Sequence, residues 1–241
     1  MARDYWAVLN AEEQKRANRF VKREHQTRFI AGRGILRSLL GQFLNVPPEQ
    51  IEFDYLPQGK PILGAKHSVS NLQFNVSHSH DLALYAISTE DKQVGIDLEW
   101  LRPFPQVLSL ARRFLTELEF ADLVSLPPSQ QERRFFQLWT AKEAYLKATG
   151  EGLTGLQTIE LSMDETSQQW HIMKSETKVN FYSFTPTENF IATVATVEND
   201  GLNLRQQSDR APDTSNRSKV VDRYSSVETL ENQLIFRNWD E

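Results

Sequence analysis

The chain has 241 residues, of which 39% are hydrophobic and 24% are charged, and its formal net charge is -5. This length suits one large domain or two small ones, and the composition is ordinary for a soluble globular protein. The chain has no cysteine, which excludes disulfides, thiolate metal sites and a thiol nucleophile. The first residues carry charge where a signal peptide has an apolar run, and no stretch has the length of a membrane span. A cytoplasmic protein is therefore expected.

Residues 10–44 are predicted to form a helix, because apolar residues recur there at roughly helical spacing. The same stretch concentrates basic side chains on an acidic chain: Lys15, Arg16, Arg19, Lys22, Arg23, Arg28, Arg33 and Arg37. A local basic surface fits an anionic ligand or an acidic partner, although a solvated helix face gives the same pattern. Nucleic acid is not expected, because the stretch lacks interleaved surface aromatics.

Short strands are predicted next, at residues 51–56, 73–77, 82–88 and 94–100, and a linker with two prolines follows at 101–105. Helices are then predicted near 106–124 and 128–149, and strands near 156–163, 169–174, 178–185 and 189–197. This repeated order indicates an α+β fold with two similar halves, residues 1–100 and 106–198, related by a pseudo-twofold axis. Each half is expected to pack helices on a mainly antiparallel sheet, with a site in the cleft between them.

The last part of the chain, residues 199–241, differs in composition from the rest. It is rich in Ser, Asp, Arg and Gln, which predicts a flexible polar extension. Near its end, Val227, Leu230, Leu234 and Ile235 recur at helical spacing. A short terminal helix is therefore predicted.

Two segments concentrate polar chemistry. In the strand at 94–100, alternation puts Gly95, Asp97 and Glu99 on one face, as in a half-buried strand with open space beside the glycine. In the helix at 128–149, the i, i+4 spacing puts Glu143 and Lys147 on one face. Three carboxylates suit a hard divalent cation such as Mg²⁺, and an ammonium suits a phosphate. Metal-assisted work on a phosphate ester or anhydride is indicated, although each pair alone is also typical of an ordinary ion pair.

Two further residues have alternative interpretations. His78, in a Ser-His-Ser turn at the end of a strand, could be a structural histidine or could hold a phosphate as a cation. A serine hydrolase is not supported, because the sequence has no nucleophile elbow and no oriented triad. Lys60 follows Gly59 in a turn, where it is either solvated or within reach of a phosphate.

Four motifs in this order resemble the 4'-phosphopantetheinyl transferase superfamily. They are Gly59-Lys60-Pro61, Phe74-Asn75-Val76-Ser77-His78-Ser79, Val94-Gly95-Ile96-Asp97-Leu98-Glu99, and Trp139-Thr140-Ala141-Lys142-Glu143-Ala144-Tyr145-Leu146-Lys147. The resemblance covers roughly residues 5–197, and the length and the two-half order resemble the surfactin-synthetase (Sfp) type. The short holo-carrier-protein synthases, by contrast, are single-half chains that trimerise. A monomer is therefore expected, because two halves already supply that interface.

The resemblance implies a defined reaction: transfer of the 4'-phosphopantetheine arm of coenzyme A to a serine of an apo acyl or peptidyl carrier protein. Adenosine 3',5'-bisphosphate is released. By this resemblance, Asp97, Glu99 and Glu143 would hold Mg²⁺, and the catalytic residues would be Glu143, Lys147 and Glu99. Glu143 would take the serine proton, directly or through a metal-bound water, with Glu99 as the competing base. Lys147 would stabilise or protonate the leaving phosphate.

The resemblance also implies a set of coenzyme A contacts. They are Arg16, Arg28, Lys60, Pro61, Ser77 and His78, with His78 at the phosphates and the lysine and arginines at the nucleotide end. Glu13 stands where relatives often carry an additional lysine, which puts that phosphate contact in doubt.

Two alternatives to transfer remain on the sequence alone. A Mg²⁺-dependent phosphodiesterase or pyrophosphatase would use the same three carboxylates and release its product to water. A second acidic cluster for a two-metal site is not visible in the sequence, which weakens this alternative. A non-catalytic module would use the basic helix to bind an acidic partner, and loss of Asp97 or Glu143 would leave its function intact.

Overall fold

The computed structural model describes residues 5–67, 70–90, 92–164, 166–167, 169–173, 177–198 and 233–238. Its helices are α2 (Ala11–Ala17), α3 (Arg23–Leu44), α4 (Val107–Phe114), α5 (Glu117–Ser125) and α6 (Pro128–Thr149). Its strands are β1 (Phe53–Tyr55), β2 (Pro61–Leu63), β3 (Gln73–Ser79), β4 (Leu82–Ser88), β5 (Lys92–Trp100), β6 (Leu161–Asp164), β7 (Gln169–Ile172), β8 (Val179–Phe184), β9 (Phe190–Glu198) and β10 (Gln233–Asn238). Within the described residues, no helix is both long enough and apolar enough to cross a membrane.

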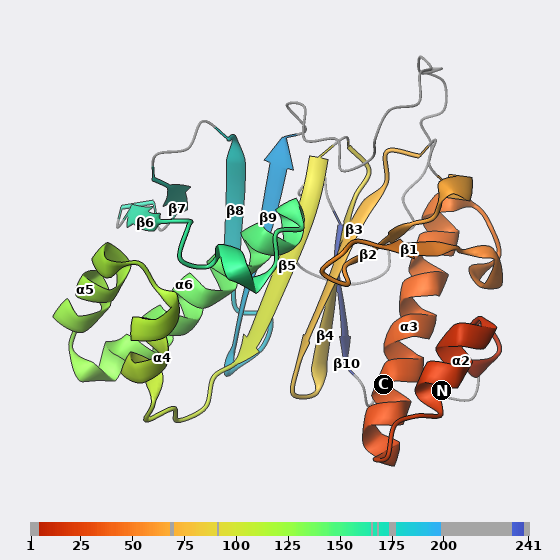
Figure 1. Ribbon diagram of the computed structural model, residues 1–241, viewed down its shortest axis with the longest axis horizontal. Helices are drawn as coiled ribbons and strands as arrows, with labels where there is room; N and C mark the ends of the chain where they lie inside the picture. Colours follow the sequence, from red (N-terminus) through yellow and green to blue (C-terminus); the bar gives the residue numbers. More distant parts are fainter. Residues whose placement is uncertain are drawn as a thin grey trace.

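Two three-stranded antiparallel sheets form the centre of the molecule, one in the order β10-β4-β3 and the other in the order β5-β9-β8 (Figure 1). Strand β4 is buried on both faces. One face, with Tyr85, packs in a cluster with residues of α3 such as Leu36 and Leu40. The other face, with Leu84, packs in a cluster with β5 and β9. The predicted α+β class with antiparallel sheets is confirmed.

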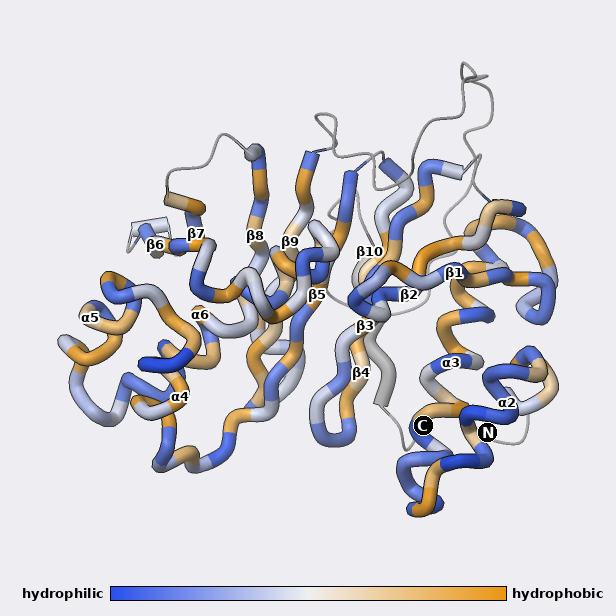
Figure 2. Tube along the Cα trace, in the orientation of Figure 1, coloured by the Kyte–Doolittle hydropathy of each residue, from blue (hydrophilic) through white to orange (hydrophobic). Residues whose placement is uncertain are grey.

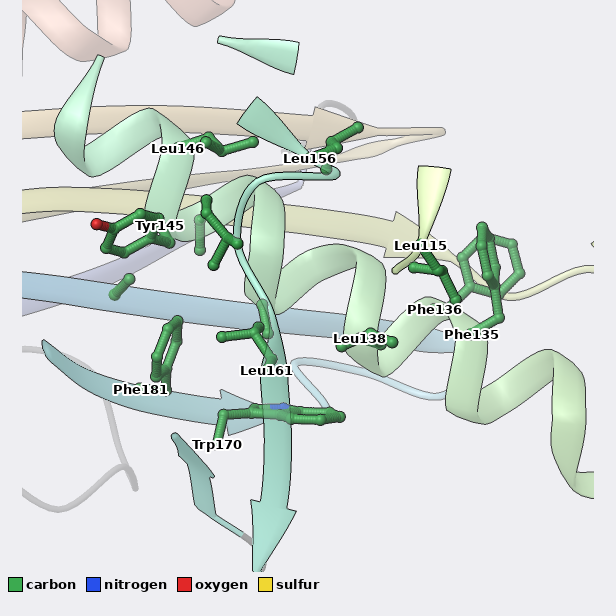
Figure 3. Packing of buried hydrophobic residues seen from close by; sticks show 14 of the residues in the cluster. Leu115, Phe135, Phe136, Leu138, Tyr145, Leu146, Leu156, Leu161, Trp170 and Phe181 are labelled. Carbon is green, nitrogen blue, oxygen red and sulfur yellow. The ribbon is translucent and has the colours of Figure 1, made fainter. Parts of the chain in front are cut away.

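Helix α3 is amphipathic, and Figure 2 shows hydrophobic and hydrophilic segments alternating along it. Helix α6 is more deeply buried, because it lies against the sheet of β5, β9 and β8 and also packs in one cluster with residues of α4, α5, β6 and β7. Figure 3 shows Tyr145 and Leu146 of this helix in the same cluster as Trp170 and Phe181. The buried later part of this helix, from Phe135 onward, is a rigid support for the polar side chains that it carries.

Strand β5 is buried on both faces, so the prediction of a half-buried strand with open space beside Gly95 is wrong. Its apolar face, with Val94 and Ile96, joins the cluster between the sheets. On the other face, a Cβ atom at Gly95 would overlap with the carbonyl oxygen of Ala144. The glycine therefore allows the backbones of α6 and β5 to touch, and the space is filled by the helix.

Two predicted helices are each divided in the structure. The helix expected at 10–44 is interrupted between Ala17 and Arg23, where the side chain of Gln26 donates a hydrogen bond of 3.2 Å to the carbonyl of Ala17 and so satisfies the end of α2. The helix expected at 106–124 is interrupted at Thr116, which forms a capping box with Glu119 and starts α5. That second boundary had a sequence signal, Thr-x-x-Glu, before a helical run.

The strands differ from the prediction at three places. Strand β2 was not predicted, and it pairs with β1 in a hairpin. The strand expected at 156–163 begins only at Leu161, after a short 3₁₀ turn at Leu153–Gly155. Strand β5, which was expected with the strands of the first half, pairs with β9 and belongs to the sheet of β8 and β9.

The end of the chain pairs with the first sheet. Leu234 and Ile235 lie in β10, which runs antiparallel to β4, where a terminal helix was predicted. The rest of that predicted helix, with Val227 and Leu230, and most of the extension at 199–241 lie outside the described residues. Ile and Phe side chains favour strands, and the free edge of β4 offers unpaired backbone groups, so tertiary pairing overrides the helical spacing here.

Candidate active site between the two sheets

Strands β3 and β5 meet through side chains rather than through a backbone ladder. Three N–H groups of β5 donate to polar side chains of β3: Ile96 to Asn75 Oδ1 at 2.9 Å, Leu98 to Ser77 Oγ at 3.2 Å, and Trp100 to Ser79 Oγ at 3.1 Å. Each bond joins residues that are 21 positions apart. This regular junction fixes the register between the polar face of β5 and the end of β3.

Asp97 is the centre of the polar cluster at this junction. It is 5% exposed, and its Oδ1 accepts from Lys147 Nζ at 2.6 Å and from Ser77 Oγ at 3.1 Å. The Lys147 ammonium also donates to Ser77 Oγ and to the carbonyl of Ile96, both at 3.2 Å. The other carboxylate oxygen, Asp97 Oδ2, is buried and has no hydrogen-bond partner. A buried anionic oxygen without a partner is costly, and it indicates a place for a cation.

Glu99 and Glu143 lie close enough to Asp97 and Lys147 for those charges to act on their pKa values. Burial, followed by the nearby charge of Asp97, raises the pKa of Glu99 to about 7 and the pKa of Glu143 to about 7, while Lys147 acts in the opposite direction on both. The sequence therefore correctly placed these carboxylates close together. Among the described residues they do not form a ready-made ligand cage, since Lys147 occupies one oxygen of Asp97.

A cavity of about 500 Å³ lies between α3, β3 and β4, and it is lined by four of the expected coenzyme A contacts: Arg16, Arg28, Pro61 and His78. Burial lowers the pKa of His78, and the cations Lys147 and Arg28 lower it further. Neighbouring cations disfavour a charged imidazole, so an anion in the cavity would relieve this repulsion.

The remaining two expected contacts lie elsewhere. Ser77 is buried and supports Asp97 and Lys147, as described above. Lys60 reaches helix α6, where its ammonium donates to the carbonyls of Lys147 and Ala148. Neither side chain belongs to the lining of the cavity.

The cavity has further walls that the sequence interpretation missed. Its lining includes His25, Phe29, Gly32, Arg33 and Tyr85. Those that belong to α3 recur at spacings of three and four residues and therefore lie on one face of the helix. This spacing is visible in the sequence. The sequence left open whether this basic stretch binds an anion or is a solvated helix face, and the cavity favours the first interpretation.

Glu13, which stands where a lysine is common, is buried beneath this wall. Its carboxylate pairs with Arg37 at 2.7 Å and with Arg33 at 3.4 Å. Nη1 of Arg33 is buried and has no hydrogen-bond partner. One carboxylate thus faces two guanidinium groups, and the pocket wall keeps an excess of positive charge despite the acidic residue.

The site therefore combines two parts. One is an acidic cluster, made of Asp97, Glu99 and Glu143 with Lys147 beside them, and the other is the adjacent basic cavity. Buried carboxylates, an ammonium and a cationic pocket together are typical of enzymes that act on phosphate esters or anhydrides.

Comparisons with known proteins agree with this class. A family model for the 4'-phosphopantetheinyl transferase superfamily matches residues 93–195, and a model for the 4'-phosphopantetheinyl transferase N-terminal region matches residues 3–90. The chain is 47% identical to the 4'-phosphopantetheinyl transferase HetI of Nostoc sp. over 80% of each chain. It is 43% identical to a putative 4'-phosphopantetheinyl transferase of Synechocystis sp., over 63% of this chain and 61% of that one. It is 27% identical to the 4'-phosphopantetheinyl transferase Sfp of Bacillus subtilis, over 69% of each.

The chain therefore belongs to the 4'-phosphopantetheinyl transferase superfamily. This confirms the resemblance drawn from the four motifs, which lie within the two matched regions.

Proposed function

We propose that this chain transfers the 4'-phosphopantetheine group of coenzyme A to a serine hydroxyl of an apo acyl or peptidyl carrier protein and releases adenosine 3',5'-bisphosphate. The observation that carries the proposal is the cluster of Asp97, Glu99, Glu143 and Lys147 beside the basic cavity. The chain acts as a monomer in this proposal, because both sheets and the whole cluster come from one chain.

The basic cavity would take the nucleotide end of coenzyme A. Arg16, Arg28 and Arg33 line it, and coenzyme A carries phosphates at that end of the molecule. Guanidinium groups bind phosphate oxygens through two parallel N–H bonds, so they suit this ligand better than a point charge. His78 lies in the same lining and is close enough to Lys147 and Arg28 for their charges to lower its pKa. It would therefore contact the phosphates nearest the acidic cluster.

The residues of the cluster fit Mg²⁺. The unpartnered Asp97 Oδ2 and the raised pKa values of Glu99 and Glu143 indicate negative charge that protein groups do not fully offset. Asp97, Glu99 and Glu143 would hold the ion, which would neutralise charge on the phosphates as the phosphorus–oxygen bond breaks.

Two side chains on one face of α6 would perform the proton and charge chemistry. Glu143 would remove the proton of the attacking serine, directly or through a metal-bound water. Glu99, which accepts a hydrogen bond from Ser79 Oγ at 3.4 Å, is the competing base. Lys147 would stabilise the charge that develops on the leaving phosphate.

The reaction itself can be tested with the purified protein, coenzyme A, Mg²⁺ and several apo carrier proteins. We expect the intact mass of a carrier to rise by one phosphopantetheine, and EDTA to prevent the rise. Cleavage of coenzyme A without modification of any carrier would support the phosphodiesterase alternative. If coenzyme A stays intact and no carrier is modified, a binding module is the better description.

The metal proposal makes a prediction about pH. Between their ordinary pKa and about 7, Glu99 and Glu143 hold more protons in the folded state than in the unfolded state, so metal-free stability falls as the pH rises through this window. Mg²⁺ binds the ionised carboxylates and should offset that loss. We therefore expect Mg²⁺ to raise the melting temperature more at pH 8 than at pH 6.

A matched pair of variants controls this measurement. Glu143→Gln should reduce the Mg²⁺-dependent rise, whereas Glu117→Gln, at an exposed position of α5, should keep it. If Mg²⁺ raised the melting temperature equally at pH 6 and pH 8, the proposed metal site would be contradicted.

A further inference from the structure

Lys60 occupies an unusual place for a residue in a surface hairpin. It follows Gly59, whose φ of +84° forms the tight turn between β1 and β2. Its ammonium donates to the carbonyl of Lys147 at 2.5 Å, to the carbonyl of Ala148 at 3.2 Å and to the carbonyl of Val94 at 3.4 Å. An ammonium has three N–H donors, and here each has a backbone acceptor.

Two of these acceptors belong to the end of α6. The last four carbonyls of a helix have no partner within the helix, and they carry the negative end of its dipole. Gly150 N–H donates to the carbonyl of Leu146 at 2.8 Å, which satisfies one of the carbonyls near this end. Lys60 provides the next two carbonyls with both a donor and a positive charge. A side chain from the first part of the chain thus caps a helix of the second part.

The third acceptor connects this cap to the acidic cluster. Val94 lies on β5, three residues before Asp97, next to the point where Gly95 lets the strand touch α6. Lys60 therefore holds the main chain of Lys147 and the main chain of β5 together. The side chains from those same segments form the 2.6 Å contact between Lys147 Nζ and Asp97 Oδ1.

We propose that Lys60 is a positioning residue that sets the place of the Lys147 ammonium against Asp97 by clamping the end of α6 to β5, instead of contacting the nucleotide. The proposal rests on the function proposed above for Lys147. Burial lowers the pKa of Lys60 to about 8, so the fold tolerates a desolvated cation at this position. An apolar side chain of similar length would fill the same space without that cost, so the charge itself has a use here.

The proposal predicts which kinetic parameter changes. In Lys60→Met, we expect kcat for carrier modification to fall by roughly 10- to 100-fold, since small displacements of reacting groups have effects of this size. The KM for coenzyme A should stay within about twofold, because uniform ligand binding is unaffected. Lys60→Arg, which keeps the charge and the donors, should retain more of the activity. A rise in the KM for coenzyme A with unchanged kcat would make Lys60 a nucleotide contact and overturn the proposal.

A second measurement does not depend on activity. Hydrogen exchange at the end of α6, at the amide of Gly150 and its neighbours, should be faster in Lys60→Met than in the parent chain. The control is Lys66→Met, because Lys66 is close in the sequence, 52% exposed and only 3.7 Å from Glu52. Unchanged exchange in Lys60→Met would overturn the clamp.

A double-mutant cycle with Lys147→Met tests whether Lys60 acts through Lys147. If Lys60 acts through Lys147, then Lys60→Met should lower kcat in the parent chain but have little further effect in the Lys147→Met background. Effects that multiply would show that Lys60 acts independently, which overturns the proposal. The parent chain serves as the separate test of the proposed function: if it modifies no carrier, the failure lies with the transfer reaction, and the exchange measurement still tests the clamp.

Discussion

Replacing Asp97 with asparagine should abolish carrier modification, with a loss in kcat of at least about 10²- to 10³-fold. Asp97 is the residue on which both parts of the site depend. Its Oδ1 holds the Lys147 ammonium at 2.6 Å, and its Oδ2 is the buried oxygen without a partner. An asparagine keeps the shape and accepts from Ser77, but it removes the charge that both a divalent cation and the ammonium require.

The same substitution should leave the fold intact. The charge of Asp97 raises the pKa values of Glu99 and Glu143, so its removal should bring both values down toward the ordinary range. Lys147 can then pair with either carboxylate, because its side chain is 30% exposed and can move. We expect a melting temperature close to that of the parent chain without metal, and little or no further rise on addition of Mg²⁺.

Asp164→Asn is the matched control, because Asp164 lies at an exposed end of β6, where its hydrogen bonds are to the nearby Thr166 and Ser167. It should keep both the activity and the Mg²⁺-dependent rise in melting temperature. If purified and folded Asp97→Asn transferred phosphopantetheine at near the parental rate, the acidic cluster would not be the active site.

The residues of the acidic cluster could be predicted from the sequence because local periodicity determines their placement. A strand period puts Asp97 and Glu99 on one face, and a helix period does the same for Glu143 and Lys147. What the pattern could not show is which face of β5 meets which helix. Gly95 was interpreted as open space, whereas its missing side chain is the reason that α6 can lie directly on the strand.

The contacts of Ser77 and Lys60 could not be predicted because they join distant parts of the chain. Ser77 contacts residues 20 and 70 positions away, and Lys60 contacts residues 87 and 88 positions away. No local pattern carries that information, and the family resemblance assigned both to coenzyme A. The face of α3 is a different case, since its helical spacing is visible in the sequence, and the sequence alone left an anionic ligand and a solvated face as alternatives. For β10, pairing with β4 decided the structure against the local helical spacing.

Replacing Lys147 with methionine should distinguish the role of the ammonium from the role of the carboxylates. We expect a loss in kcat of about 10²- to 10³-fold, because the ammonium that contacts Asp97 would no longer stabilise the leaving phosphate. The KM for coenzyme A should change little, since Lys147 is not among the residues that line the cavity. Steady-state kinetics with a saturating carrier protein measures both parameters.

The loss of the positive charge in Lys147→Met should also change the pH dependence of the rate and the stability. Lys147 lowers the pKa values of Glu99 and Glu143, so its removal should raise both and move the acid limb of the rate profile to higher pH. Asp97 would then be buried without its partner, and metal-free stability should fall. Because the three carboxylates remain and their competing ammonium is gone, Mg²⁺ should raise the melting temperature by more than in the parent chain.

This larger rise in melting temperature on addition of Mg²⁺ is opposite to the response expected for Asp97→Asn. The comparison therefore tests whether the carboxylates and the ammonium have separate roles in the site. Lys147→Arg keeps a charge but presents a planar, wider group, so it should restore stability more fully than turnover. Lys66→Met controls for the loss of a lysine as such, at an exposed position. If Lys147→Met lost its response to Mg²⁺ along with its activity, the ammonium would be organising the carboxylates, and its proposed role at the leaving phosphate would be wrong.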